Sequence, residues 1–165
     1  MLEPIWLSVF RMLIGTPEIP GSQSNPMILQ WVKDLKAPEW YDNDDKPWCA
    51  LGLNRVFLAT QMEVAGTGYD LFRAKTFETW GVPLTVPALG CVMTFVRPEG
   101  GHVGLYLGER KDAYSILGAN QSNTVGIAWI KKDRLTSTRW PANVPLPTSG
   151  RIWLNGTAAV STNEG

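Results

Sequence analysis

Residues 45–50 read Asp-Lys-Pro-Trp-Cys-Ala, and this segment predicts where the central helix of the fold begins. Pro47 suits a helix start, because its fixed φ fits the first turn and its missing N–H is not needed there. Apolar side chains then recur every three or four residues from Cys49 to Gln61, as they do on one face of a helix. Cys49 is therefore expected in the first helical turn.

A cysteine at that position has two interpretations. Unpaired N–H groups and the positive end of the helix dipole stabilise a thiolate, which is the activated nucleophile of a cysteine hydrolase. Alternatively, Cys49 is a buried structural residue that only packs against its neighbours. The remainder of the chain decides between the two.

Length and composition favour one globular domain. The chain has 165 residues, of which 44% are hydrophobic and 18% charged, which excludes a disordered protein. Fifteen basic residues balance fifteen acidic ones, which argues against a nucleic-acid binder held by phosphate contacts. Two cysteines, Cys49 and Cys91, allow at most one disulfide, so the chain is not a disulfide scaffold.

Neither a signal peptide nor a membrane span is predicted. Residues 1–14 are apolar but contain Glu3 and Arg11, and they lack a basic n-region and an A-x-A cleavage site. No run approaches the roughly 18 uncharged apolar residues of a membrane helix. We expect a monomer made in the cytoplasm, with no membrane insertion, that reaches any target outside the cell by another route.

Helices are expected first and strands afterwards. Besides the helix that begins at Cys49, three helices are expected. The first covers residues 2–14, the second opens with Asn25 as N-cap and Pro26 as first helical residue, and a short third one covers residues 71–80. The strand-like segments that follow share short lengths and close spacing; they are residues 91–96, 102–108, 113–117, 124–130 and 135–140. Their short connections imply an antiparallel sheet, and therefore an α+β fold.

We expect one catalytic domain over residues 1–141. From residue 142 to 165 the chain is rich in Pro, Ser, Thr and Gly, which predicts an extended C-terminal tail with at most one strand, near residues 151–154.

The single histidine limits the chemistry that is available. Any imidazole base must be His102, and a site with two histidine ligands is excluded. Cys49 begins a helix, His102 begins a strand after a Gly-Gly turn, and Asn120 ends the next strand. A nucleophile, a base and a polar group that orients the base are the components of a catalytic triad in its cysteine form. The alternative for His102 is a surface histidine with satisfied hydrogen bonds.

Glycines surround the histidine on both sides, at positions 100, 101, 104 and 108. Glycine in a strand is costly unless something approaches the backbone closely. This pattern favours a catalytic histidine with open backbone around it.

Several short segments follow one another in a characteristic order; they are Glu18-Ile19-Pro20-Gly21, Asn25-Pro26, Pro47-Trp48-Cys49-Ala50, Gly66-Thr67-Gly68, Trp80-Gly81, Gly101-His102-Val103-Gly104-Leu105-Tyr106-Leu107-Gly108, Leu117-Gly118-Ala119-Asn120-Gln121-Ser122 and Arg139-Trp140-Pro141. In this order they resemble the phage-associated branch of the NlpC/P60 and CHAP cysteine peptidase/amidase superfamily. The resemblance covers residues 16–141, and its specific parts are the Trp-Cys and Gly-His-Val-Gly segments.

This resemblance implies a papain-like α+β fold of the NlpC/P60 type, with N-terminal helices packed on a C-terminal antiparallel β-sheet and the catalytic cysteine at a helix N-terminus. It implies cleavage of peptide or amide bonds in bacterial peptidoglycan, with Cys49 as nucleophile and His102 as base. Asn120 falls where the family places its polar third residue, and Gln121 competes for that role. Many members use a second histidine there, which this chain lacks.

A second departure from the family pattern lies before the first predicted strand. The segment that usually reads Pro-Gly-Asp is here Leu89-Gly90-Cys91. We interpret Cys91 as a small, buried apolar residue.

Three residues are predicted to bind substrate: Trp48, Trp80 and Gln121. Flat aromatic side chains stack on sugar rings and cover peptide stems, although packing in the core is the alternative for each tryptophan.

An acidic loop precedes the nucleophile. Oxygen ligands at Asp42, Asp44 and Asp45, with Asn43 between them, suit Ca²⁺, but the glycine and distal glutamate of an EF-hand loop are absent. The alternative is a solvated loop whose aspartate caps the helix. We expect no cofactor, with calcium as the alternative.

The sequence thus predicts a peptidoglycan hydrolase, such as a phage or prophage endolysin that is released through a membrane pore or carried on the virion. Two alternatives remain open: a non-catalytic wall-binding or virion structural module on the same fold, and an antibacterial amidase effector.

Overall fold

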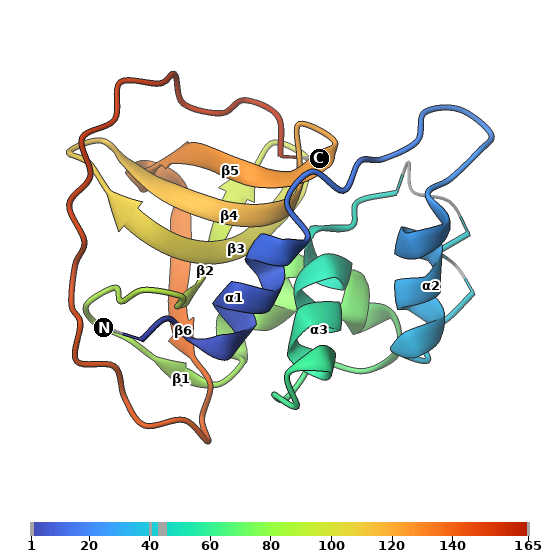
Figure 1. The fold of residues 1–165 in the computed structure, drawn as a ribbon, viewed down its shortest axis with the longest axis horizontal. Helices are drawn as coiled ribbons and strands as arrows, with labels where there is room; N and C mark the ends of the chain where they lie inside the picture. The colour runs from blue at the N-terminus through green and yellow to red at the C-terminus, as the bar shows by residue number, and fades with distance from the viewer. Residues whose placement is uncertain (1, 40, 43–45, 165) are drawn as a thin grey trace.

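The computed structural model describes residues 2–39, 41–42 and 46–164, and it confirms the predicted α+β fold. Three α-helices lie beside a six-stranded antiparallel sheet, as Figure 1 shows; they are α1 (Ile5–Met12), α2 (Pro26–Asp34) and α3 (Cys49–Ala59). No helix in the described part of the chain is long and apolar enough to cross a membrane.

The sheet has the spatial order β1-β6-β2-β3-β4-β5. Its strands are β1 (Val82–Pro83), β2 (Val92–Arg97), β3 (Gly100–Glu109), β4 (Ala113–Gln121), β5 (Thr124–Lys131) and β6 (Leu135–Trp140). The five strands expected from the sequence are confirmed within a few residues at their ends. The two-residue β1 was not predicted, because it is too short to carry a periodic signal.

Local sequence explains where the helices start. The side chain of Asn25 accepts a hydrogen bond of 2.9 Å from the backbone N–H of Met27, and Pro26 is the first residue of α2, as predicted. The helix expected over residues 71–80 is instead a pair of short 3₁₀-helices, η1 (Gly68–Phe72) and η2 (Ala74–Thr79). Arg73 has an extended backbone between them, which prevents a continuous α-helix.

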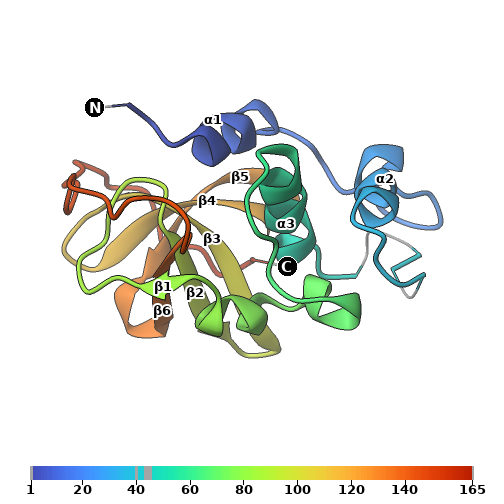
Figure 2. The ribbon, with the colours of Figure 1, turned by 90° about the horizontal axis from the view of Figure 1, so that it is seen from below.

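Helix α3 is the centre of the fold. It packs across β3 and β4, and α1 and α2 pack against it from outside, as Figure 2 shows. Eight of its eleven residues are buried, so it has little of the amphipathic character of a surface helix. A Cβ atom added at Gly52 would lie only 2.6 Å from Ala119 Cβ, so this glycine allows α3 to approach β4 closely.

The glycine at position 104 serves packing within the sheet. A Cβ atom there would lie 2.4 Å from Ile116 Cγ2 and 2.7 Å from the carbonyl oxygen of Leu117. The sequence predicted that something approaches the backbone closely at the strand glycines. At Gly104 this neighbour is strand β4. At Gly108, the corresponding contact is with Leu154 of the C-terminal segment, at 2.5 Å.

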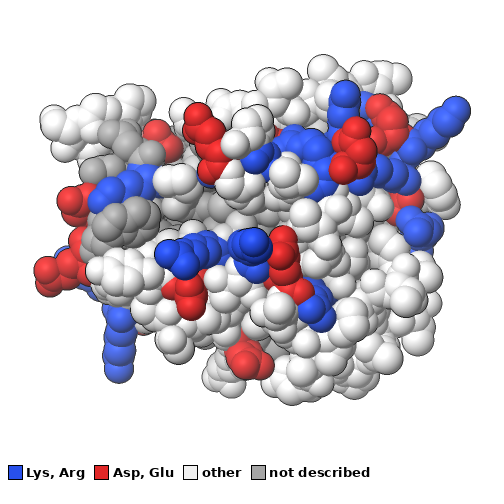
Figure 3. All heavy atoms as spheres, turned by 180° about the vertical axis from the view of Figure 1, so that it is seen from behind, with Lys and Arg blue, Asp and Glu red and all other residues white. Residues whose placement is uncertain are grey.

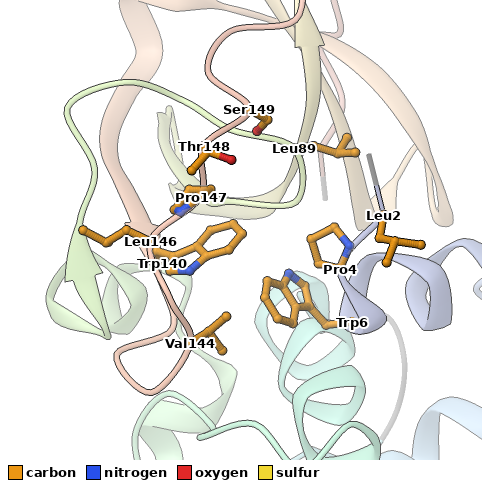
Figure 4. A pocket seen from close by; sticks show the side chains of 10 residues that line it. All are labelled: Leu2, Pro4, Trp6, Leu89, Trp140, Val144, Leu146, Pro147, Thr148 and Ser149. Carbon is orange, nitrogen blue, oxygen red and sulfur yellow. The ribbon is translucent and has the colours of Figure 1, made fainter.

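The C-terminal segment, residues 142–164, first passes the N-terminal residues. Figure 4 shows the side chains of Trp6 and Trp140 facing a cavity of about 280 Å³ that residues 144–149 help to line. The two rings meet edge to face, with centroids 5.2 Å apart. The segment then returns along the sheet (Figure 1), with single bridges at Trp153 and Val160, so the predicted strand near residues 151–154 is reduced to one bridge.

Candidate active site

Cys49 is the first residue of α3 and is 2% exposed. Trp48 is the N-cap residue, and its own side chain makes no capping hydrogen bond. The backbone N–H groups of Cys49 and Ala50 lie at the thiol, where they act to lower its pKa. The sequence prediction of a cysteine in the first helical turn is confirmed.

The thiol lies at a cleft of about 530 Å³ between the start of α3, the 3₁₀-helices and the β2–β3 turn. Its lining residues come from these elements; they are Pro47, Cys49, Phe72, Arg73, Ala74, Lys75, Glu78, Phe95, Val96, Arg97, Gly100, Gly101 and Thr136. We call this space the cleft. It gives a ligand access to the otherwise buried nucleophile.

His102 lies on β3 with no exposed surface. Its Nε2 atom is 2.9 Å from Oε1 of Gln121. The side-chain amide of Gln121 donates to the carbonyl oxygens of Ile116 (3.1 Å) and Gly126 (2.6 Å), which leaves Oε1 to accept from the imidazole. This network assigns the ring proton to Nε2, so Nδ1 is the basic nitrogen.

The fold places Cys49 against the strand that carries the histidine. The backbone of Val103, the residue after His102, hydrogen-bonds the Cys49 thiol and acts to lower its pKa. The start of α3 therefore lies directly on the His102 end of β3. The Nδ1 atom of His102 has no hydrogen-bond partner among the described residues, although it is buried.

Burial controls the protonation of both groups. It raises the pKa of the Cys49 thiol, against the opposing effects of Arg97 and of the backbone N–H groups. It lowers the pKa of His102 to about 4, against the opposing hydrogen bond to Gln121. In this state the pair is a neutral thiol and a neutral imidazole, not an ion pair.

The residue that hydrogen-bonds His102 is Gln121, which the sequence analysis offered as the competitor of Asn120 for the third position. Asn120 is buried, and its Oδ1 has no partner among the described residues. The reason is a β-bulge: β4 has one extra residue between the pairs Gly118–Gly126 and Gln121–Thr124. Asn120 takes up the irregularity with a φ of +56°. In regular alternation Asn120 would share the face of Gly118, but the extra residue places Gln121 there.

Gly118 adjoins this hydrogen bond, and the sequence analysis did not single it out. A Cβ atom on it would lie 2.6 Å from Gln121 Oε1 and 3.1 Å from His102 Nε2. Glycine is thus required where the histidine and the glutamine meet. The signal was present in the segment Leu-Gly-Ala-Asn-Gln, but only the strand pairing shows which side of Gly118 the histidine occupies.

The prediction that Trp48 and Trp80 line the cleft is wrong. Trp48 is 0% exposed, packs 6.1 Å from the Trp31 ring and donates to Glu18. Trp80 is 6% exposed and stacks on Phe57 at 4.8 Å. Both side chains therefore stabilise the core. The third predicted substrate-binding residue, Gln121, is also buried and contacts His102 instead of the cleft.

Other aromatic and charged residues take their place along the cleft. Phe72 and Phe95, which are 6% and 1% exposed, contribute ring edges to its lining, and Arg73, Lys75 and Glu78 supply the charges. On the face seen in Figure 3, basic side chains lie among acidic ones instead of forming a single patch. The cleft can therefore hold a ligand that carries both apolar groups and carboxylates.

The acidic loop is described only in part. Asp42 is exposed and pairs with Lys46 Nζ at 2.9 Å, while Asp44 and Asp45 lie outside the described residues. Among residues 2–39, 41–42 and 46–164, no three histidine, cysteine or acidic side chains are grouped to hold a metal ion. The calcium alternative and the capping alternative both stay predictions.

No protein-family model matches this chain, and no curated protein matches it in sequence. The features that bear on function are therefore the cleft and the three residues Cys49, His102 and Gln121.

Proposed function

We propose that this protein is a cysteine peptidase or amidase that hydrolyses bacterial peptidoglycan on a papain-like fold. The observation that supports this most is the buried hydrogen bond between His102 and Gln121, on the strand whose next residue contacts the Cys49 thiol. A nucleophile at a helix start, a base and an orienting amide are the three parts that thiol hydrolysis needs. The resemblance to the NlpC/P60 and CHAP superfamily supports peptidoglycan as the substrate.

The reaction begins with proton transfer from the Cys49 thiol to Nδ1 of His102. The thiolate attacks the carbonyl carbon of the scissile bond, and the N–H groups of the first turn of α3 stabilise the oxyanion. The imidazolium then gives its proton to the leaving amine, and a thioester is left on Cys49. Water that His102 activates attacks this thioester, which releases the acid product and restores the thiol.

Gln121 acts on this cycle as a positioning residue. Its Oε1 accepts from Nε2–H of His102 in both the neutral and the charged state of the ring. Nδ1 is therefore left as the nitrogen that takes the proton from Cys49 and gives it to the leaving amine. The amide does not exchange a proton with the ring. Its own two donors are fixed on backbone carbonyls, which holds Oε1 in place.

The cleft suits a peptide that carries carboxylates. Lys75 is exposed on one wall, Arg73 stands beside it, and Phe72 and Phe95 provide apolar surface between the charges. Stem peptides of peptidoglycan contain both free carboxylates and short apolar side chains. The resemblance to the phage-associated branch further supports a role as a phage or prophage lysin.

The test is digestion of purified sacculi under reducing conditions, followed by mass spectrometry of the released muropeptides. We expect soluble fragments with new amino termini or with free muramyl lactyl groups, and these two products distinguish peptidase from amidase cleavage. The His102→Ala variant is expected to release none. Sacculi that stay intact with the wild-type protein would contradict the proposal.

A further inference from the structure

The C-terminal segment ends against the proposed catalytic histidine. In both Figure 1 and Figure 2 the last coloured part of the chain approaches the start of α3. The carbonyl oxygen of Asn163 accepts from the N–H of Ser122 at 3.0 Å, directly after Gln121. The backbone of Glu164 lies close enough to the His102 ring to act on its pKa, in the raising direction. Residues 161–164 thus adjoin the triad, and we call them the terminal segment.

A buried ion pair holds the terminal segment in place. The carboxylate of Glu164, which is only 3% exposed, pairs with the guanidinium of Arg134. Glu164 and Thr162 also face Arg97 across a cavity of about 210 Å³. A glutamate is seldom buried to this extent unless it is paired, so Arg134 selects a carboxylate at this position.

The preceding residues are attached to the sheet more extensively. Glu109 has no exposed surface and accepts hydrogen bonds from Tyr106 (2.8 Å), Lys132 (2.7 Å) and Arg151 (2.9 Å). The N–H of Ile152 donates to Tyr106 Oη at 3.0 Å. We call residues 151–156 the anchor. Because the anchor has its own partners, the terminal segment can leave the site while the anchor stays attached.

The chemistry requires such a movement. A general acid must come within about 2.6–3.2 Å of the leaving amine, or reach it through one water molecule. His102 has no exposed surface, and Nδ1 is buried without a partner among the described residues. The cleft reaches Cys49, but His102 is not among its lining residues. In the resting state a ligand can therefore reach Cys49 through the cleft, but the leaving group of that ligand cannot reach His102.

We propose that the terminal segment is an autoinhibitory strap, which covers His102 at rest and is released when the Glu164–Arg134 pair breaks. This inference rests on the proposed function, because it assigns His102 as the general acid. It also identifies the Arg134 site as a carboxylate-binding position next to the triad. A substrate or an acidic peptide that competes for Arg134 would displace the strap.

The experiment uses the full chain with Glu164→Gln and, separately, Arg134→Gln, which remove the same ion pair from opposite sides. Glu63→Gln is the matched control, because Glu63 is an exposed glutamate whose side chain touches neither the strap nor the cleft. Two rates are measured at pH 7: alkylation of Cys49 by iodoacetamide, located by mass spectrometry, and release of muropeptides from sacculi.

We expect both rates to rise at least about fivefold in each ion-pair variant and to stay unchanged in the control, since hydration of His102 restores a stronger base beside the thiol. Unchanged rates in a folded variant would overturn the strap. A fall in hydrolysis would also overturn it, because the terminal segment would then position His102 instead of blocking it. Faster alkylation without hydrolysis by any form would support the strap and contradict the proposed function.

Discussion

Acidification is predicted to destabilise the fold through His102, and the size of the effect follows from its burial. The pKa of His102 is about 4 in the folded protein, compared with 6.5 for an exposed histidine. The unfolded chain therefore binds a proton at a higher pH than the folded one. The resulting stability is fully present above pH 6.5 and is lost as the pH falls toward 4.

A difference of about 2.5 pKa units, at about 1.36 kcal/mol per unit, amounts to about 3 kcal/mol over the whole window. Between pH 7.5 and pH 5 the expected loss is about 2 kcal/mol. This is a large share of the roughly 5–15 kcal/mol that stabilises a typical domain. Aspartates and glutamates with lowered pKa values contribute mainly at more acidic pH, so the pH 5 measurement isolates the histidine.

The assay is urea unfolding followed by tryptophan fluorescence at pH 7.5 and pH 5, with wild-type protein and His102→Gln. The glutamine is polar and does not titrate, so the variant is expected to lose about 2 kcal/mol less than the wild type between the two pH values. Equal pH dependence in the two proteins, with equal m-values, would refute the reasoning. His102 would then be hydrated in the folded state, and the neutral resting pair would be wrong.

Three further predictions concern the triad, the sheet and the acidic loop. Gln121→Ala should reduce the rate of muropeptide release about 100-fold and shift its acidic pH limb, whereas Asn120→Ala should change the rate less than about threefold. Gly104→Ala should cost about 2–3 kcal/mol in urea unfolding because its Cβ meets Ile116 Cγ2 at 2.4 Å, whereas Gly126→Ala, whose Cβ meets nothing closer than 3.6 Å, should stay within about 0.5 kcal/mol. EDTA should leave the melting temperature unchanged if the loop is a solvated connection, and a fall that Ca²⁺ reverses would favour the calcium alternative.

The helix starts and the strands could be predicted because their signals are local. Asn25 and Pro26 define the start of α2 through one hydrogen bond and one fixed φ, whereas the start of α3 was predicted from Pro47 and from the apolar periodicity that begins at Cys49. All strands of the sheet except β1 were predicted from short apolar runs and their spacing. These features depend on neighbours in the sequence, not on the tertiary fold.

Which residue hydrogen-bonds His102 could not be predicted, because it depends on one extra residue in β4. A shift of one residue moves a side chain to the other face of a sheet, and the bulge at Asn120 does this for Gln121. Trp48 shows a similar limit, since an aromatic residue beside a nucleophile can face the cleft or the core. Its contacts with Trp31 and Glu18 come from segments far away in the sequence.

The position of the C-terminal segment could not be predicted from the sequence either. The residues that hold it, such as Glu109 with Arg151 and Arg134 with Glu164, are paired across 30 or more positions and follow no period. Composition predicted an extended tail, but composition does not show what a tail covers. The contacts of Asn163 with Ser122 and of Glu164 with Arg134, which place this segment beside Gln121, appear only in the folded chain.

The central claim is that Cys49 is the nucleophile of a peptidoglycan hydrolase, and a second buried cysteine makes a matched control. The decisive measurement is the rate of muropeptide release from sacculi by the wild type, Cys49→Ala and Cys91→Ala, each checked for folding by circular dichroism. Both thiols are buried, but only Cys49 adjoins the cleft. We predict activity in the wild type and in Cys91→Ala and only background release in Cys49→Ala. Full activity in Cys49→Ala, or no activity in any of the three folded proteins, would contradict the account.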